Sequence, residues 1–218
     1  AVSNDLKKEK IKNFEIKNDI KVIPNFIDLG KLNLSSRKTH SNTKVLTHIS
    51  NFRPVKRVLD VINIFKRVNS IIDCKLFMIG DGPERISTES LVKKYNLDKK
   101  VIFLGNTKDI ERILLQTDLF LLPSESESFG LAALEAMAYS IPVITTNKGG
   151  IIEVVDNNKN GFTIDVGDVS MMAEKVIKIL DDDVMYLQFS KKAHEKALKF
   201  DIENILPMYE REYLSLLK

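Results

Sequence analysis

The sequence contains few residues of the kinds that crosslink small secreted domains or bind structural metals. Its 218 residues include one cysteine, Cys74, and three histidines, His40, His48 and His194. A single cysteine cannot form an internal disulfide, and no spacing of cysteine and histidine suggests a structural zinc site. We therefore expect a protein of a reducing, cytoplasmic compartment.

Long apolar runs and a strong excess of one charge are also missing. No apolar stretch approaches the ~20 residues that a membrane-spanning helix needs, and residues 1–12 alternate charged and apolar residues instead of forming a signal peptide. The 33 basic and 30 acidic residues leave a net charge of only +3. This balance predicts a soluble protein without a nucleic-acid partner.

Several well-known catalytic motifs are absent. The chain has no Gly-x-x-x-x-Gly-Lys-Ser/Thr loop, no Gly-x-Ser-x-Gly turn and no His-Glu-x-x-His helix. Residues 80–85, Gly-Asp-Gly-Pro-Glu-Arg, imitate a dinucleotide-binding fingerprint, but Arg85 occupies the third glycine position and Pro83 stiffens the turn. This mismatch disfavours an NAD-dependent oxidoreductase. The acidic run at 181–183 is predicted to be a solvated helix end and not a metal site.

The composition is that of a folded domain, with 44% hydrophobic and 29% charged residues. From residue 44 onward, short apolar runs alternate with amphipathic stretches, which is typical of βαβ units. The predicted fold is α/β, a Rossmann-like doubly wound parallel sheet of about six strands with helices on both faces. The predicted strands are 44–50, 74–80, 101–105, 118–123, 142–146 and 162–165, and the predicted helices are 55–68, 84–94, 109–116, 131–139 and 170–180.

The two ends of the chain differ from this pattern. Residues 1–43 hold one apolar stretch, interrupted by Pro24 and Asn25, and a polar segment at 35–43 with the composition of a linker. We interpret 1–43 as a remnant of an N-terminal domain and 44–199 as a ligand-binding domain. Residues 200–218 form a last predicted helix with Pro207 as a kink or break.

Three basic residues follow the first predicted strand. Arg53, Lys56 and Arg57 lie at the start of a predicted helix, where the helix macrodipole ordinarily favours acids. Cations at that end are consistent with an anion that side chains and amide groups hold together. The alternative is a solvated basic turn.

An acidic loop and an apolar helix follow the fourth predicted strand. Gly130 permits backbone amides to approach a ligand closely. The helix at 131–139 is apolar except at Glu135, and because an unpaired buried carboxylate is costly, Glu135 needs hydrogen-bond donors. These are either ligand hydroxyls or groups inside the fold. Glu127, in the loop, is either a binding residue or a solvated acid.

These loops together resemble the donor-binding half of the GT-B glycosyltransferases of family four, which use nucleotide sugars and retain the anomeric configuration. The specific part is the Glu-x7-Glu motif, Glu127-Ser-Phe-Gly-Leu-Ala-Ala-Leu-Glu135, and Gly80-Asp-Gly-Pro, Gly149-Gly-Ile-Ile-Glu153 and Gly161 also match in order and spacing. Residues 22–28, 48–57 and 122–131 are similar to members that act in bacillithiol biosynthesis. The resemblance implies transfer of N-acetylglucosamine from UDP-N-acetylglucosamine to L-malate.

The resemblance also implies roles for residues. Lys56, with Arg53 nearby, would neutralise the departing diphosphate in place of a metal, Glu127 would hold a sugar hydroxyl, and Glu135 would accept hydrogen bonds from the ribose. The base would rest against residues 104–106. The implied donor-binding residues are Asn51, Gly105, Asn106, Ser128, Phe129, Gly130, Leu131 and Glu135.

The sequence departs from the family pattern in two places. Asn51 stands where the family commonly has an arginine, and the chain is expected to begin near the last strand of the first GT-B half. The L-malate site would then belong mainly to that absent N-terminal domain, and this fragment alone is expected to be inactive. The resemblance also implies that the last helix, in residues 200–218, crosses back onto that domain. No cofactor besides the UDP-sugar is expected, and a homo-oligomer remains open. The alternatives are a family-four enzyme with a polysaccharide or lipid acceptor and a nucleotide-sugar-binding module without turnover.

Overall fold

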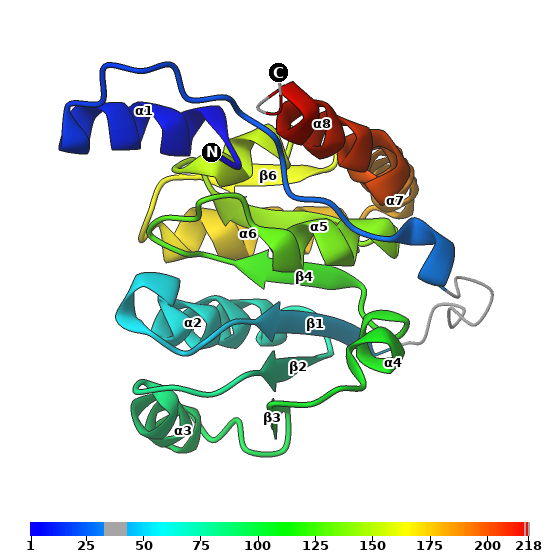
Figure 1. Ribbon diagram of the computed structural model, residues 1–218. Helices are drawn as coiled ribbons and strands as arrows, with labels where there is room; N and C mark the ends of the chain where they lie inside the picture. The colour runs from blue at the N-terminus through cyan, green and yellow to red at the C-terminus, as the bar shows by residue number, and fades with distance from the viewer. Residues whose placement is uncertain (33–42, 216, 218) are drawn as a thin grey trace.

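A computed structural model describes residues 1–32, 43–215 and 217. Its centre is one parallel sheet of six strands in the order β3-β2-β1-β4-β5-β6 (Figure 1). The prediction of a doubly wound parallel sheet of about six strands is confirmed. The strands are β1 (Lys44–Ile49), β2 (Cys74–Ile79), β3 (Val101–Gly105), β4 (Leu119–Leu122), β5 (Val143–Thr146) and β6 (Gly161–Ile164).

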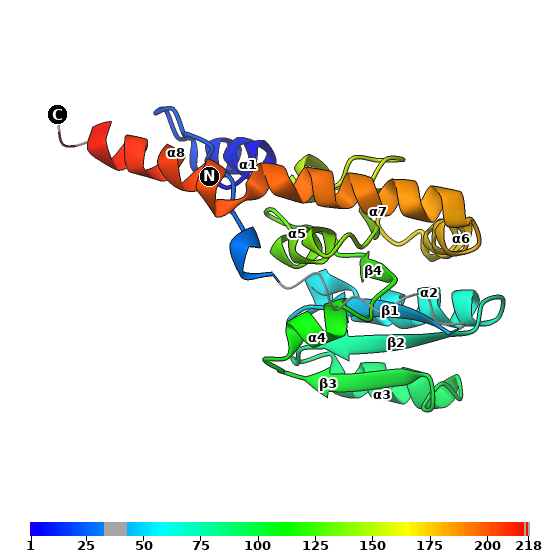
Figure 2. The ribbon, with the colours of Figure 1, turned by 90° about the vertical axis from the view of Figure 1, so that its right-hand side faces the viewer.

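Helices cover both faces of this sheet (Figure 2). The helices α2, α3 and α6 pack on one face, and α4 and α5 pack on the other with α7 lying against α5. All five predicted helices are present. Their bounds are α2 (Val58–Asn69), α3 (Arg85–Lys94), α4 (Ile110–Leu114), α5 (Leu131–Ala138) and α6 (Val169–Leu180). They are followed by α7 (Asp183–Ala197) and by α8 (Ile202–Ser215), which is the last predicted helix.

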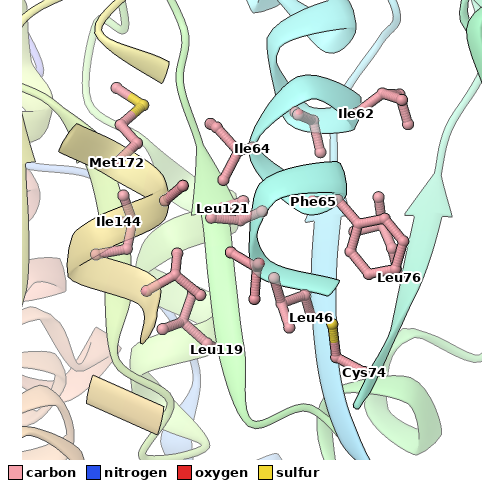
Figure 3. Packing of buried hydrophobic residues seen from close by; sticks show 14 of the residues in the cluster. Leu46, Ile62, Ile64, Phe65, Cys74, Leu76, Leu119, Leu121, Ile144 and Met172 are labelled. Atoms are coloured by element: carbon pink, nitrogen blue, oxygen red, sulfur yellow. The ribbon is translucent and has the colours of Figure 1, made fainter. Parts of the chain in front are cut away.

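The sheet has one hydrophobic core on each face, because successive side chains of a strand point to opposite faces. Leu119 and Leu121 of β4 enter the core under α2 and α6, whereas Phe120 and Leu122 enter the core under α5. Figure 3 shows Leu121 below Ile64 of α2, and Phe65 of the same helix beside Leu76 of β2, in the first core. All four residues of β4 are buried, as expected for a central parallel strand covered on both faces.

The segment between β1 and α2 differs from its prediction. A helix was expected from residue 55, but Pro54–Lys56 form a 3-10 helix, η3, and Arg57 adopts a left-handed backbone with φ of 52°. The α-helix therefore begins at Val58. This turn directs Lys56 to the carboxyl end of the sheet, whereas Arg57 forms an ion pair with Asp60.

The N-terminal residues contain a helix, α1 (Asn4–Phe14), that the sequence reading missed. It has no buried residue, so apolar periodicity did not reveal it. Ser3 caps it by accepting a hydrogen bond from the Leu6 amide, and Glu153 accepts hydrogen bonds from the Asn4 and Asp5 amides. Most of the predicted linker at 35–43 lies outside the described residues.

The C-terminal helix α8 continues through Pro207, so of the predicted kink or break the break is wrong. Ile205 is its buried residue, while Leu206, Tyr213 and Leu214 are exposed. Figure 2 shows α8 projecting beyond the sheet and its covering helices. In the described part of the chain, no helix is long and apolar enough to cross a membrane. Asp182, in the acidic run, caps α7 by accepting a hydrogen bond from the Met185 amide.

Candidate functional site

A cleft of about 690 Å³ lies at the carboxyl ends of the strands, where ligands bind in open α/β sheets. The ends of β1, β2 and β4, the loop after β3 and the first turn of α5 form its walls. The lining residues are Asn25, Ile49, Ser50, Asn51, Lys56, Ile79, Gly80, Asp81, Asn106, Thr107, Ile110, Leu122, Glu127, Ser128, Phe129, Gly130, Leu131 and Ala132. Eight of the eleven predicted site residues are among them; Arg53, Gly105 and Glu135 are not.

An ion pair between Lys56 and Glu127 lies in this cleft. The Lys56 Nζ donates to Glu127 Oε1 at 2.7 Å, and the Ser124 hydroxyl donates to the same oxygen at 2.7 Å. The two charged side chains are 20% and 10% exposed, respectively. Glu127 is therefore not the solvated loop acid that the sequence left open. The pair places one cation and one carboxylate side by side, which suits a ligand with both anionic and hydroxyl groups.

Two glycines hold the Glu127 loop in place. A Cβ on Gly149, whose φ is 82°, would lie 2.4 Å from the Glu127 carbonyl oxygen, and a Cβ on Gly150 would lie 2.1 Å from the Ser128 carbonyl oxygen. The Gly150 amide donates to the Glu127 carbonyl. The structure shows that they permit close backbone packing beneath Glu127 and Ser128.

The first turn of α5 faces the same cleft. Gly130 precedes the helix with φ of 93°, and no side chain caps the helix start. The first-turn amides of a helix have no partner within the helix, so Leu131 and Ala132, which line the cleft, begin a set of free donors. Together with the helix dipole these amides favour an anion. Lys56 and the start of α5 therefore line the same cleft.

Glu135 lies one turn further along α5 and lines a second hollow of about 400 Å³. Ile110 borders both hollows, so the two adjoin. Among the described residues, no hydrogen bond or ion pair involves Glu135, and burial raises the pKa of its carboxyl. Burial, with Glu111 and Glu135, also raises the pKa of the Tyr139 phenol. The sequence left two sources of donors open for Glu135, ligand hydroxyls or groups inside the fold, and the described part of the fold supplies none.

The remaining predicted residues lie outside the cleft lining. Arg53 is exposed and precedes η3, and among the described residues it forms no ion pair. Gly105 has φ of 61° and its carbonyl accepts a hydrogen bond from the Gly80 amide. Leu104 is 37% exposed, while Asn106 next to Gly105 reaches the cleft. Arg53 is therefore not among the residues that line the cleft, and its role as a second cation near Lys56 stays a prediction.

The Gly80-Asp-Gly-Pro segment serves packing between loops. A Cβ on Gly80 would lie 1.8 Å from the Ser50 carbonyl oxygen, and one on Gly82 would lie 2.9 Å from the Phe52 backbone. These glycines are explained by the close approach of two loops, in line with the rejection of a dinucleotide fingerprint.

Sequence reasoning missed several polar residues of the cleft. Ser50 and Asp81 each follow a strand by one or two positions, so their distance from the strand end could have identified them. Thr107 follows the predicted base-binding loop directly. Asn25 was noted as an interruption of an apolar stretch and within the segment 22–28 that resembles the family, but neither observation predicted that it lines the cleft.

Comparison with known proteins places this geometry among glycosyltransferases. Residues 32–196 match the family described as Glycosyl transferases group 1. The chain is 38% identical over its whole length to the N-acetyl-alpha-D-glucosaminyl L-malate synthase of Bacillus anthracis and covers 59% of that protein. It is 28% identical to the poly(ribitol-phosphate) alpha-N-acetylglucosaminyltransferase of Staphylococcus aureus, over 88% of this chain and 39% of that protein.

Solved structures share the fold. A mutant of S. aureus TarM, determined with fondaparinux, alpha-GlcNAc-glycerol and UDP, superposes with a TM-score of 0.86 and 25% identity over 96% of this chain and 42% of that one. The Anabaena HepE complex with UDP and glucose gives a TM-score of 0.86 at 24% identity, over 99% of this chain and 62% of that one. The chain thus spans about half the length of such proteins.

Proposed function

The chain belongs to the group 1 glycosyl transferases, and we propose that it is the donor-binding half of a retaining enzyme that transfers N-acetylglucosamine from UDP-N-acetylglucosamine to L-malate. The observation that carries the donor site is the Lys56–Glu127 ion pair in a cleft that also receives the uncapped start of α5. The identity of donor and acceptor is supported by the 38% identity to the B. anthracis synthase over the whole chain.

The diphosphate of the donor binds between Lys56 and the first turn of α5. Negative charge grows on the leaving phosphate as the bond to the sugar breaks. A cation and oriented amides that are already in place stabilise that charge more than they stabilise the bound substrate, and so they lower the barrier. Lys56 exchanges part of its contact with Glu127 for the phosphate. No metal ion is required for this step.

The two acids of the motif take different parts of the donor. Glu127, in the cleft beside Lys56, accepts a hydrogen bond from a hydroxyl of the transferred sugar. Glu135, in the adjoining hollow, accepts hydrogen bonds from the ribose, a task for which a carboxylate has several lone-pair sites. Retention then proceeds by front-face attack: the acceptor hydroxyl attacks the anomeric carbon, and the leaving phosphate oxygen takes the acceptor's proton.

A second candidate is the same donor chemistry with a polymeric acceptor. The similarity to the S. aureus poly(ribitol-phosphate) enzyme favours it, at lower identity and over less of the chain. Both candidates share the donor site, so donor titrations do not separate them. A turnover assay of the full-length gene product with L-malate or with poly(ribitol phosphate) does.

The proposal is tested by calorimetric titration of the full-length gene product with UDP, UDP-N-acetylglucosamine, ADP and NAD. We expect binding that is selective for uridine nucleotides. Lys56→Ala should lower the turnover number more than Glu135→Ala, because Lys56 acts on charge that develops in the transition state. Glu135→Ala should mainly weaken UDP binding. Preference for NAD, or equal losses of turnover with unchanged UDP affinity in both variants, would contradict the proposal.

A further inference from the structure

His48 is a buried histidine on β1 that the proposed mechanism does not use. Its side chain is 0% exposed, and both ring nitrogens have partners. Nδ1 lies 2.8 Å from the Leu121 carbonyl oxygen, and Nε2 lies 2.7 Å from the Ser50 hydroxyl oxygen. A carbonyl oxygen can only accept a hydrogen bond, so Nδ1 must carry a proton.

The protonation state of Nε2 follows from the surroundings of the ring. Burial, with a smaller contribution from the Lys56 charge, lowers the pKa of His48 to about 4. The Phe52 ring packs beside it, with 6.2 Å between the ring centroids. The imidazole is therefore neutral near pH 7, and with the proton on Nδ1 its Nε2 is an acceptor. The Ser50 hydroxyl must then donate its proton to Nε2.

This arrangement determines what Ser50 can offer to a ligand. Ser50 lines the cleft, and its one hydroxyl proton is already committed to His48. The oxygen therefore presents only lone pairs to the cleft. A phosphate oxygen, which also accepts, is disfavoured at that position, whereas a hydroxyl or an amide N–H is favoured.

The position of Ser50 in the sheet indicates which part of the donor it meets. The Ser50 hydroxyl bonds to His48, whose other ring nitrogen lies 2.8 Å from the Leu121 carbonyl oxygen of β4, the strand that leads to Glu127. The Lys56 charge also lowers the pKa of His48. The segment expected to hold the base follows β3, two strands away from β1. The Ser50 hydroxyl therefore lies on the side of the cleft that holds Lys56 and Glu127.

Building on the proposed function, we propose that His48 is a positioning residue that makes Ser50 an acceptor-only contact for a hydroxyl or amide N–H of the transferred sugar. Ser50 would then distinguish UDP-sugars from UDP, because it contributes to binding only when the sugar is present.

The test measures binding of UDP and of UDP-N-acetylglucosamine to the full-length gene product by calorimetry. We expect Ser50→Ala to lower the affinity for UDP-N-acetylglucosamine about fivefold, which corresponds to the loss of one hydrogen bond. The affinity for UDP should not change. His48→Phe keeps a flat ring but loses both hydrogen bonds, and it should lower the affinity for the sugar nucleotide by a similar factor. The double variant should bind no more weakly than Ser50→Ala alone, because His48 acts through Ser50.

Two control variants complete the test. Ser90→Ala removes an exposed serine hydroxyl on α3 that bonds to Ile86, and it should change neither affinity. His194→Phe removes a comparable hydrogen bond to the Ala138 carbonyl without reaching the cleft, so it reports the cost of a lost histidine–carbonyl contact.

Each outcome decides the proposal. If Ser50→Ala lowers the affinities for UDP and for the sugar nucleotide equally, Ser50 contacts the nucleotide and not the sugar. If neither affinity changes, Ser50 contacts no part of the donor. Additive losses in the double variant would make His48 a purely structural residue. Any of these results overturns the inference and leaves the proposed function standing. If the unmutated protein binds neither compound, the proposed function fails, and the inference fails with it.

Discussion

The two acids of the Glu-x7-Glu motif lie in different environments although they are eight positions apart. Glu127 is paired with Lys56 and Ser124, whereas Glu135 has no partner among the described side chains and its pKa is raised by burial. A buried carboxylate is stable only when it is paired or when it stays protonated. The same residue type therefore depends on a cation at one position and on a ligand or a proton at the other.

Substitution of Lys56 is expected to lower the stability of the fold as well as the rate of the reaction. Lys56→Met leaves Glu127, 9% exposed, without its cation, and we expect the free energy of unfolding to fall by about 1–3 kcal/mol. Lys56→Met combined with Glu127→Gln should recover most of that loss, because no unpaired charge remains. Urea unfolding of the two variants checks this. A double variant as unstable as the single one would show that the ion pair itself is not the cause.

Glu135 should make stability depend on pH in a defined direction. Burial raises the pKa of the folded carboxyl above its ordinary value of 4.5, so the folded state holds the proton more tightly than the unfolded chain does. This contribution is complete below pH 4.5 and is lost as the pH rises through the folded pKa. Glu135→Gln should therefore raise the melting temperature at about pH 8 and change it little at about pH 4, while it weakens UDP binding.

Thermal melts at the two pH values check the Glu135 prediction. Glu174→Gln, an exposed change on α6 where the side chain is 63% exposed, serves as the control and should leave both melting temperatures unchanged. A lower melting temperature for Glu135→Gln at the higher pH would mean that the carboxylate has a stabilising partner in solution.

At the scale of the elements, the strands and covering helices followed from local pattern. The continuous apolar runs of β4 and β5 mark strands buried on both faces, and these were predicted within one or two residues. The helix α1 was missed because it buries no residue and so lacks apolar periodicity, and because Glu153, which bonds to its first turn, lies 149 positions away from Asn4.

The glycines of the loops were located from the sequence, but their roles differ. Gly149→Ala would place a Cβ 2.4 Å from a backbone oxygen, whereas Gly105→Ala would meet nothing within 4 Å; both residues have positive φ. We expect Gly105→Ala to cost about 1 kcal/mol, the conformational strain alone, and Gly149→Ala to cost about 3 kcal/mol. Equilibrium unfolding in urea compares the two. Equal costs would mean that the 149–150 turn relaxes away from Glu127.

At the scale of the whole molecule, the segments at both ends of the chain lie against each other, and the N-terminal segment reaches the cleft at Asn25. Residues 1–32 and α8 are joined to each other by the Ile27 and Ile202 backbones and by the Lys21–Glu212 ion pair. Figure 1 shows α1 and α8 beside β6, at the edge of the sheet opposite β3. The exposed apolar residues of α8 fit the expectation that residues 200–218 cross back to an N-terminal domain, which stays a prediction.

Substitution of two equally exposed leucines tests whether α8 crosses back to an N-terminal domain. Leu214 of α8 and Leu187 of α7 are both 61% exposed. If α8 docks against a further domain, Leu214→Glu places a charge in that interface and should lower the turnover of the full-length gene product at least several-fold. Leu187→Glu, with the same change of residue at the same exposure, should leave turnover unchanged. Equal effects of the two substitutions, or none from either, would show that the apolar side of α8 faces solvent in the working protein.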